Sequence, residues 1–131
     1  MRRAAIISAT AVLTVFAWVT QGWASPHIPP GKPHTFVATA YCRGRLTTTG
    51  TRVAPRTIAA DPAVIPLGSI VRIQGLDAPY NGQYTVLDTG SKIRGRRVDL
   101  YVRNCKEATK FGRRFARLFV VWRPRRPPPG R

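Results

Sequence analysis

The segment Arg97-Val98-Asp99-Leu100-Tyr101-Val102 carries the clearest structural signal in the chain, because apolar and polar residues alternate along it without a break. Side chains of a β-strand point alternately to opposite faces. The three aliphatic residues must therefore face a core, while Asp99 and Tyr101 stand together on the accessible face. A carboxylate beside an aromatic ring is typical of sites that hold a sugar. An ordinary solvated strand face is the alternative interpretation.

Five further segments have strand character, since they are short, rich in Val, Ile, Tyr and Phe, and separated by Gly, Pro, Asn and Asp. These segments are Thr35–Tyr41, Thr57–Ala60, Ser69–Gln74, Gln83–Leu87 and Arg117–Trp122. One helix is predicted from Cys105 to Phe111, with Asn104 as its N-cap and Gly112 at its end. Six short strands and one short helix favour a small closed β-barrel over a sandwich.

The N-terminal residues differ in character from the rest of the chain. Arg2 and Arg3 precede an apolar run from Ala4 to Val19, and Gly22-Trp23-Ala24 offers small residues at the −3 and −1 positions of a cleavage site. This layout predicts a secretory signal peptide over residues 1–24. A membrane anchor is the alternative, although the run is short for a span of about 20 residues. We therefore expect an exported protein, located in the periplasm, at the outer membrane or in the cell wall.

The remaining residues have room for one domain. Residues 25–33 are rich in proline and are predicted to form a linker. Residues 34–123 are predicted to form the barrel. Residues 124–131 combine proline with arginine, so we expect an extended basic tail.

The chain contains only two cysteines, Cys42 and Cys105. In an oxidising compartment we expect them to form a disulfide, which would close a loop of about 60 residues and stabilise the fold by roughly 3–5 kcal/mol. Two free buried thiols are the alternative. The sequence has no Cys-x-x-Cys motif and no histidine cluster, so we predict neither a metal site nor a cofactor.

Charge is the strongest compositional signal, since 22 Lys and Arg residues stand against five Asp and Glu residues, a net charge of +17 at pH 7. Such a surface attracts polyanions. Export argues against nucleic acid, which would also require aromatic residues interleaved with arginines on one face, and the arginine-rich tail has only Trp122 nearby. We therefore predict that the basic surface binds anionic envelope polymers or lipids, and we expect no nucleic acid.

The five acidic residues are few enough to consider one by one. Glu107 fits the first turn of the predicted helix, and Asp77 lies in a loop. Asp61 and Asp88 each open a turn-forming sequence. Asp99 alone has no local structural explanation, which makes it the first candidate for a functional carboxylate.

The run Val86-Leu87-Asp88-Thr89-Gly90-Ser91 is similar to the Asp-Thr-Gly motif of aspartic proteases. A single-motif protease carries this motif near the start of its domain, followed later by an apolar-apolar-Gly segment. Here the motif lies past the middle of the mature domain, and the downstream segment Phe119–Arg123 contains no glycine. The sequence therefore argues against a protease.

Six motifs in order, between Phe36 and Trp122, together resemble the 3D (Asp-Asp-Asp) domain family, which is found in lytic transglycosylases and wall-remodelling proteins. The motifs are Phe36-Val37-Ala38-Thr39-Ala40-Tyr41, Thr47-Thr48-Thr49-Gly50, Ile58-Ala59-Ala60-Asp61-Pro62, Val64-Ile65-Pro66-Leu67-Gly68-Ser69, Asp88-Thr89-Gly90 and Arg97-Val98-Asp99-Leu100-Tyr101. The resemblance implies an all-β fold, specifically a six-stranded double-psi β-barrel. It also implies a peptidoglycan lytic transglycosylase, which cleaves the MurNAc–GlcNAc bond with a 1,6-anhydro product in cell-wall turnover.

The resemblance assigns the three named aspartates to Asp61, Asp88 and Asp99, with Asp99 at the catalytic acid/base position. We expect Asp88 to assist catalysis by raising the proton affinity of Asp99, because two nearby like charges resist ionising together. Peptidoglycan glycan strands are the expected substrate. The predicted substrate-binding residues are Asp61, Thr47, Tyr101, Thr89 and Gly90.

A binding module without catalysis is the alternative function. Expansin- and barwin-like proteins share this barrel type and bind or loosen polysaccharide without hydrolysing it. The fold alone does not separate the two functions, so the site must do so.

Overall fold

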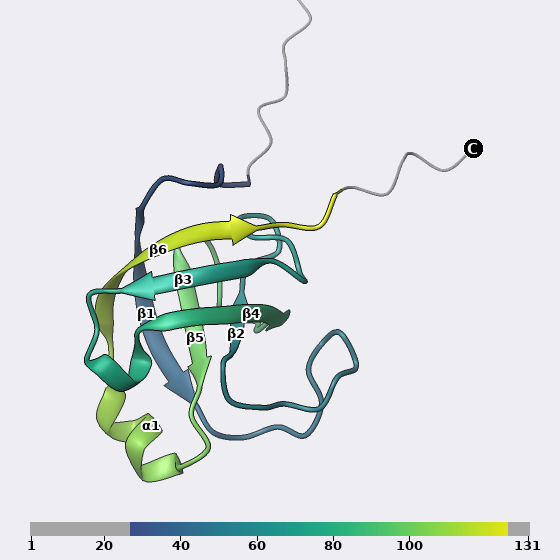
Figure 1. Ribbon diagram of the computed structural model, residues 1–131. Coiled ribbons are helices and arrows are strands. Elements are labelled where there is room, and N and C mark those ends of the chain that lie inside the picture. The colour runs from purple at the N-terminus through teal and green to yellow at the C-terminus, as the bar shows by residue number, and fades with distance from the viewer. Residues whose placement is uncertain (1–26, 126–131) are drawn as a thin grey trace, which may run out of the picture.

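The computed structural model describes residues 27–125, which form a closed six-stranded barrel with one short α-helix (Figure 1). The strands are β1 (His34–Tyr41), β2 (Thr57–Ala60), β3 (Ile70–Gln74), β4 (Gly82–Asp88), β5 (Arg97–Tyr101) and β6 (Arg114–Trp122). The helix is α1 (Cys105–Phe111), and a 3₁₀ turn, η1, covers Ala78–Tyr80. The predicted all-β, six-stranded double-psi barrel is confirmed.

The strands close the barrel in the order β1-β5-β2-β4-β3-β6. Two neighbouring pairs, β1 with β5 and β2 with β4, are parallel, and the other pairs are antiparallel. Only β3 and β4 are neighbours both in the barrel and along the chain. Each of the other pairings joins segments that are distant in the sequence.

The predicted strands agree with the observed ones to within a residue or so, except for β6. This strand begins at Arg114, three residues earlier than expected, because Arg114 and Phe115 pair with Ala38 and Val37 of β1. The longer strand carries Phe115 on the barrel wall as well, and this residue is 75% exposed.

The core follows the alternation that the sequence predicts. Val98 and Leu100 of β5 are fully buried, and Val102 just beyond the strand is buried as well. They pack with side chains from the other strands, among them Phe36, Ile58 and Leu118. Asp99 and Tyr101 are only partly buried on the opposite face of β5, as expected.

Helix α1 begins and ends where the sequence predicts. The Asn104 side chain accepts hydrogen bonds from the backbone N–H groups of Lys106 and Glu107, and Gly112 follows the last residue of the helix. The predicted disulfide is confirmed between Cys42 and Cys105, which are 63 residues apart in the sequence. It joins the residue after β1 to the first residue of α1.

Part of the segment 25–33, which we expected to be a linker, packs against the barrel. Ile28 is buried in the core cluster and its N–H donates to the Val64 carbonyl at 3.1 Å. The Gly31 N–H donates to the Val120 carbonyl at 3.2 Å. The apolar side chain of Ile28 explains this packing, because it covers the core beside Val64.

The predicted signal peptide, residues 1–24, lies outside the described residues, and so does most of the predicted tail beyond Arg125. Within residues 27–125, no helix has the length and hydropathy needed to span a membrane.

Candidate active site

The two aspartates singled out for catalysis lie on neighbouring strands with one small residue between them. Asp99 of β5 is opposite Ala59 of β2, and Ala59 is in turn opposite Asp88 of β4. Neighbouring strands lie about 4.8 Å apart, so the backbones of the two aspartates are separated by roughly 10 Å across Ala59. Ala59 is only 3% exposed, so the groups around the two aspartates cover its methyl group. We use the name aspartate groove as a label for these three register partners on the outer wall, Asp99, Ala59 and Asp88.

A β-bulge brings Asp88 into this groove. The register of β2 and β4 shifts between Ile58 and Ala59, so that Ala59 pairs with Asp88 and Leu87 is passed over. Val86 is fully buried, and simple alternation would send Asp88 to the same inner face. Bulges commonly redirect a side chain in this way beside functional sites.

Asp99 is partly buried and accepts one hydrogen bond from the part of the chain that the structure describes. Its Oδ1 accepts a 2.8 Å bond from the hydroxyl of Thr39, its partner across the parallel β1–β5 pair. Burial raises the pKa of Asp99 above its ordinary value, while the Thr39 hydrogen bond and the charge of Arg97 act in the opposite direction. The negative charge of Asp88 adds a smaller increase in the pKa of Asp99. Asp88 is thus a weaker cause than we expected, because Ala59 separates the two carboxyl groups.

Asp88 accepts hydrogen bonds from three residues and so connects β1, the loop at Thr48 and the end of β4. Its Oδ1 accepts from the backbone N–H of Thr48 at 3.1 Å, the Thr48 hydroxyl at 2.9 Å and the Thr89 N–H at 2.9 Å. Its Oδ2 accepts from the Tyr41 hydroxyl at 3.2 Å. Both oxygens are therefore engaged in fixing the walls of the groove.

Residues 46–52 form a turn rich in threonine that we call the threonine loop. Leu46 and Arg52 pair across it, and Gly50 adopts a φ of +80°, which suits glycine. Thr47 is buried, and its hydroxyl bonds to the Thr49 and Thr51 hydroxyls, so it stabilises the loop from within. Its neighbour Thr48 is the residue that reaches Asp88.

Tyr41 and Tyr101 lie side by side at the end of the β1–β5 pair. Their ring centroids are 5.5 Å apart in an edge-on arrangement. Burial, followed by the charge and hydrogen bond of Asp88, holds the pKa of the Tyr41 hydroxyl well above its usual range. Tyr41 therefore stays protonated and donates to Asp88. The predicted sugar-binding role of Tyr101 remains a prediction.

Asp61 holds two loops together. Its Oδ1 accepts from the Ala63 N–H at 3.0 Å, in the predicted turn, and its Oδ2 accepts from the Gly95 N–H at 2.8 Å. Hydrogen bonds from Gly95 and Ala63, with the charge of Arg94, lower the pKa of Asp61 despite its burial. The carboxylate thus ties the turn after β2 to the loop before β5, and no hydrogen bond joins it to Asp88 or Asp99 in the described part of the chain.

Thr89 and Gly90 border the groove behind Asp88. The Thr89 hydroxyl bonds to that of Thr48 at 2.8 Å, which links the threonine loop to the end of β4. A Cβ atom on Gly90 would lie 2.8 Å from Cγ1 of Ile93, so only glycine fits this packing. In residues 27–125, no three His, Cys, Asp or Glu side chains gather as metal ligands would.

Three residues that form hydrogen bonds with Asp99 or Asp88 were not among the site residues predicted from the sequence. They are Thr39, Tyr41 and Thr48. Alternation already puts Thr39 and Tyr41 on the outer face of their strand, opposite Phe36 and Ala38. Their closeness to the aspartates depends on the parallel pairing of β1 with β5, which the sequence did not predict. Thr48 lies within the Thr-Thr-Thr-Gly motif, next to the residue that we selected.

The fold and the groove define a class of small closed β-barrels that carry a pair of carboxylates on the outer wall. The model of the 3D domain family matches residues 56–122, slightly more than half of the chain. This protein belongs to the 3D domain family.

Two curated relatives come from Bacillus subtilis (strain 168). The SPbeta prophage-derived uncharacterized protein YorM is 38% identical over 104 residues, covering 66% of this chain and 41% of YorM. The cell wall-binding protein YocH is 40% identical over 57 residues, covering 44% of this chain and 18% of YocH. The chain therefore spans less than half the length of either relative.

Among solved structures, a crystal structure of MltA from Escherichia coli, described as a unique lytic transglycosylase fold, matches with a TM-score of 0.50 at 18% identity. The match covers 57% of this chain and 26% of MltA. At this identity the similarity supports the fold of the barrel.

Proposed function

We propose that this protein is a peptidoglycan lytic transglycosylase, which cleaves the MurNAc–GlcNAc bond and leaves a 1,6-anhydro product. The observation that carries the proposal is Asp99, a partly buried carboxyl whose pKa is raised by burial, on the outer face of β5 and across Ala59 from Asp88. A raised pKa suits a general acid, because part of the population then keeps its proton closer to neutral pH. Membership of the 3D domain family supports the same reaction.

In this mechanism Asp99 performs both proton transfers. Protonated Asp99 donates to the glycosidic oxygen as the bond from that oxygen to C1 of MurNAc breaks. The resulting Asp99 carboxylate accepts the proton of the C6 hydroxyl of the same sugar, and O6 forms the new bond to C1. Asp99 is protonated again at the end, so the cycle needs no water and no second proton carrier.

The state of Asp88 favours this reaction over hydrolysis. An inverting glycosidase needs a second carboxylate, about 6.5–9.5 Å from the acid, that activates a water. Asp88 lies across Ala59 from Asp99, and both its oxygens already accept hydrogen bonds from Thr48, Thr89 and Tyr41. We therefore assign Asp88 the role of a positioning residue, which holds the threonine loop and Tyr41 around the substrate.

The direct experiment is mass spectrometry of the muropeptides released from purified peptidoglycan. We expect the wild-type protein to release 1,6-anhydro muropeptides and Asp99→Asn to release almost none. Asp77→Asn is the matched control, because Asp77 is an exposed acid whose carboxylate pairs with Arg114 outside the groove. Products that gain a water in place of the anhydro ring would contradict the proposed reaction and indicate a hydrolase.

A wall-binding module without catalysis is the second candidate function. It is favoured by the relative YocH, whose name describes cell-wall binding, and by the high positive charge of the chain. If the wild type bound sacculi tightly and released no muropeptide, this candidate would replace the enzyme. Under both functions we propose that the protein acts in the cell envelope, where the predicted signal peptide would deliver it.

A further inference from the structure

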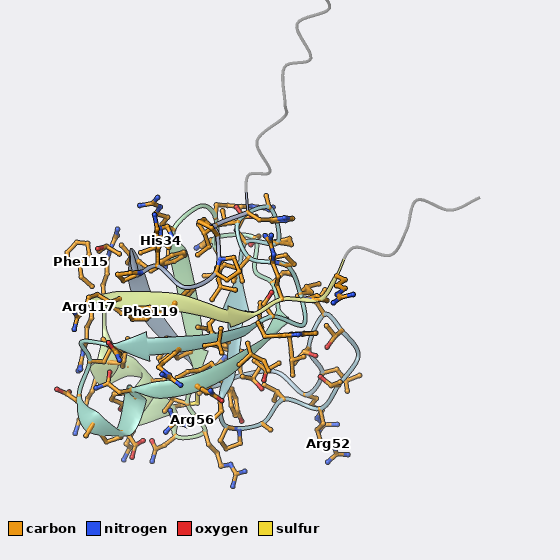
Figure 2. The ribbon with its side chains drawn as sticks, turned by 45° about the horizontal axis from the view of Figure 1, so that its top comes forward. His34, Arg52, Arg56, Phe115, Arg117 and Phe119 are labelled. Atoms are coloured by element: carbon orange, nitrogen blue, oxygen red, sulfur yellow. A yellow bond between two sulfur atoms is a disulfide. The ribbon has the colours of Figure 1, made fainter. Side chains whose placement is uncertain are left out.

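The outer wall of β6 and β3 carries aromatic rings and guanidinium groups that the active site does not use. Phe115, Arg117 and Phe119 follow one another along β6 with one buried residue between each pair (Figure 2). Such residues are about 6.6 Å apart on one face of a strand. Arg72 of β3 is the register partner of Phe119 and is exposed. Rings and cations therefore interleave on this face of the barrel, outside the C-terminal tail.

No negative charge balances these arginines. Of the five acidic residues of the chain, Asp88 and Asp99 are engaged in the aspartate groove, Asp61 holds two loops together, and Glu107 lies on α1. The fifth, Asp77, pairs with Arg114 at 2.6 Å. Within residues 27–125, no carboxylate forms an ion pair with Arg72 or Arg117. This face therefore offers free positive charge to a ligand.

The same face is hollowed where β6, β3 and the N-terminal segment meet. A hollow of about 430 Å³ is lined by Arg72, Gln74 and Phe119, with Pro30 and Gly31 on one side. The hollow thus combines an aromatic ring, an amide and a guanidinium group. Such a combination can cover the apolar face of a sugar, bond its hydroxyl groups and pair with an attached anion.

We propose that this face is a second binding site, which holds an anionic glycan chain on the side of the barrel away from the aspartate groove. A sugar ring stacks on Phe119, Gln74 bonds its hydroxyl groups, and Arg72 and Arg117 pair with carboxylate or phosphate groups along the chain. We call this site the β6 face, defined by Phe115, Phe119, Arg72, Gln74 and Arg117.

The choice of a glycan over other polyanions rests on the proposed function, whereas the site itself rests on the contacts above. The amide and guanidinium groups of the hollow suit the hydroxyl and anionic groups of a glycan, whereas a lipid surface would bind through the exposed apolar side chains Phe115 and Val121, so vesicles are tested as well. Nucleic acid also suits interleaved rings and arginines, so it must be tested directly. The β6 face does not depend on catalysis, since the aspartate groove lies on β5, β2 and β4.

The experiment measures binding of the purified protein carrying Asp99→Asn, which keeps the polymer intact during the measurement. The two probes that distinguish the source of the anion are soluble peptidoglycan strands with their stem carboxylates and a phosphate-bearing wall polysaccharide. Dextran supplies sugar without charge, and polyphosphate supplies charge without sugar. We expect at least one of the two anionic glycans to bind more tightly than both dextran and polyphosphate.

Two substitutions test the face itself, each with a matched control. We expect Arg72→Gln and Phe119→Ala each to weaken glycan binding about tenfold or more. Arg103→Gln removes the same charge from an exposed position outside the face, and Phe119→Tyr keeps the aromatic ring in place. We expect both controls to stay within about twofold of the parent.

Equal weakening by Arg72→Gln and Arg103→Gln would overturn the proposal, because it would indicate attraction by net charge alone. Binding that depended on Arg72 and Phe119 but was tighter for phosphatidylglycerol vesicles or single-stranded DNA would also overturn it. In the active protein, Arg72→Gln should leave the turnover of short soluble muropeptides unchanged. A lack of turnover with intact glycan binding would contradict the proposed enzymatic function but would still support glycan binding by the β6 face.

Discussion

The aspartate groove and the β6 face lie on the same barrel but differ in how far their charged side chains are paired within the protein. In the groove, hydroxyl and N–H groups from β1, the threonine loop and β4 fix Asp99 and Asp88 within short hydrogen bonds. On the β6 face, Arg72 and Arg117 have no acidic partner among residues 27–125, and Phe115 is largely exposed. The first region keeps its charges in place, whereas the second leaves them free to meet a ligand.

This difference separates positioning from adhesion. A proton-transfer group must be held within a fraction of an ångström, which requires a supporting shell of hydrogen bonds. A surface that holds a variable polymer gains more from unpaired cations and open rings, because they adapt to successive units of the chain. The two regions should therefore respond differently to the same kind of mutation.

The largest expected effect separates the two regions in one pair of variants. Asp99→Asn should lower the rate of anhydro-muropeptide release by about 10²–10⁴-fold and leave polymer binding unchanged, because general acid–base groups contribute this much to catalysis. Phe119→Ala should weaken polymer binding and leave the rate of anhydro-muropeptide release from short fragments unchanged. Turnover of short fragments and polymer binding are measured on both variants, and a variant that lost both functions together would contradict the separation.

The next largest effect concerns the support of the groove. Replacing both Cys42 and Cys105 with alanine opens a loop that spans 63 residues, and the loop-entropy model expects a loss of about 4 kcal/mol in the free energy of unfolding. Chemical denaturation of the oxidised protein and the double variant measures this loss. Because Cys42 directly follows Tyr41, we expect the surviving folded protein to lose turnover more than polymer binding. Equal stability of the two proteins would be the contrary result.

A smaller effect is expected from the turn that Asp61 holds. Asp61→Ala removes two hydrogen bonds from a carboxylate to the backbone, and we expect a loss of about 1–3 kcal/mol in the free energy of unfolding. The folded pKa of Asp61 is lowered, so its contribution exists above its unfolded pKa and disappears as the pH falls through the folded value. The difference from wild type should therefore shrink in acid. Asp77→Ala is the exposed control, and an equal loss from it would remove the special role of Asp61.

The ionised Asp99 side chain should destabilise the folded protein at neutral pH. Its folded pKa is raised, so its favourable contribution exists at low pH and is lost as the pH rises through the folded value. Asp99→Asn, which never ionises and can still accept from Thr39, should unfold at a higher temperature than wild type at pH 7 and at a similar temperature in acid. Arg72→Gln on the β6 face should show no such dependence. Thermal unfolding at several pH values checks both variants.

The smallest expected effect is a change in the pKa of Asp99 that leaves the site otherwise intact. Thr39→Val removes the hydroxyl that stabilises the ionised form of Asp99, so the pKa of Asp99 should rise further. The alkaline limb of the pH–rate profile should shift to higher pH, with a change in maximal rate well below the hundredfold loss expected from removing an acid. Thr39→Ser keeps the hydroxyl and should keep the wild-type profile. An unchanged profile in Thr39→Val would mean that Asp99 is not the acid.

Local patterns in the sequence predicted which segments become strands, but they did not predict which strands meet. Alternation correctly separated Leu100 from Asp99, and the helix limits followed from Asn104 and Gly112. Thr39 was missed because its contact depends on a parallel pair formed by segments that lie about 60 residues apart. The Asp88 side chain points outward because of a β-bulge, although simple alternation would turn it inward. Such a bulge has no simple signature in the sequence.

The β6 face was missed for a related reason. The last strand predicted from the sequence begins at Arg117 and leaves Phe115 out, and the arginine-rich tail has only Trp122 nearby. Pairing with β1 extends the strand to Arg114 and brings Phe115 and Arg117 onto one face. A strand that gains residues from tertiary pairing is beyond what local propensity can predict.

The order of the strands around the barrel also bears on how the chain folds. Because only β3 and β4 form a hairpin, nearly every pairing must first close a long loop of disordered chain, and such topologies fold slowly, on the scale of milliseconds to seconds. Asp99 meets Thr39 and Ala59 only after β5 has docked between β1 and β2, and the barrel closes only when β6 joins β1 to β3. A nascent or partly unfolded chain therefore has strands but no groove, and no fragment that ends before β6 should retain any activity.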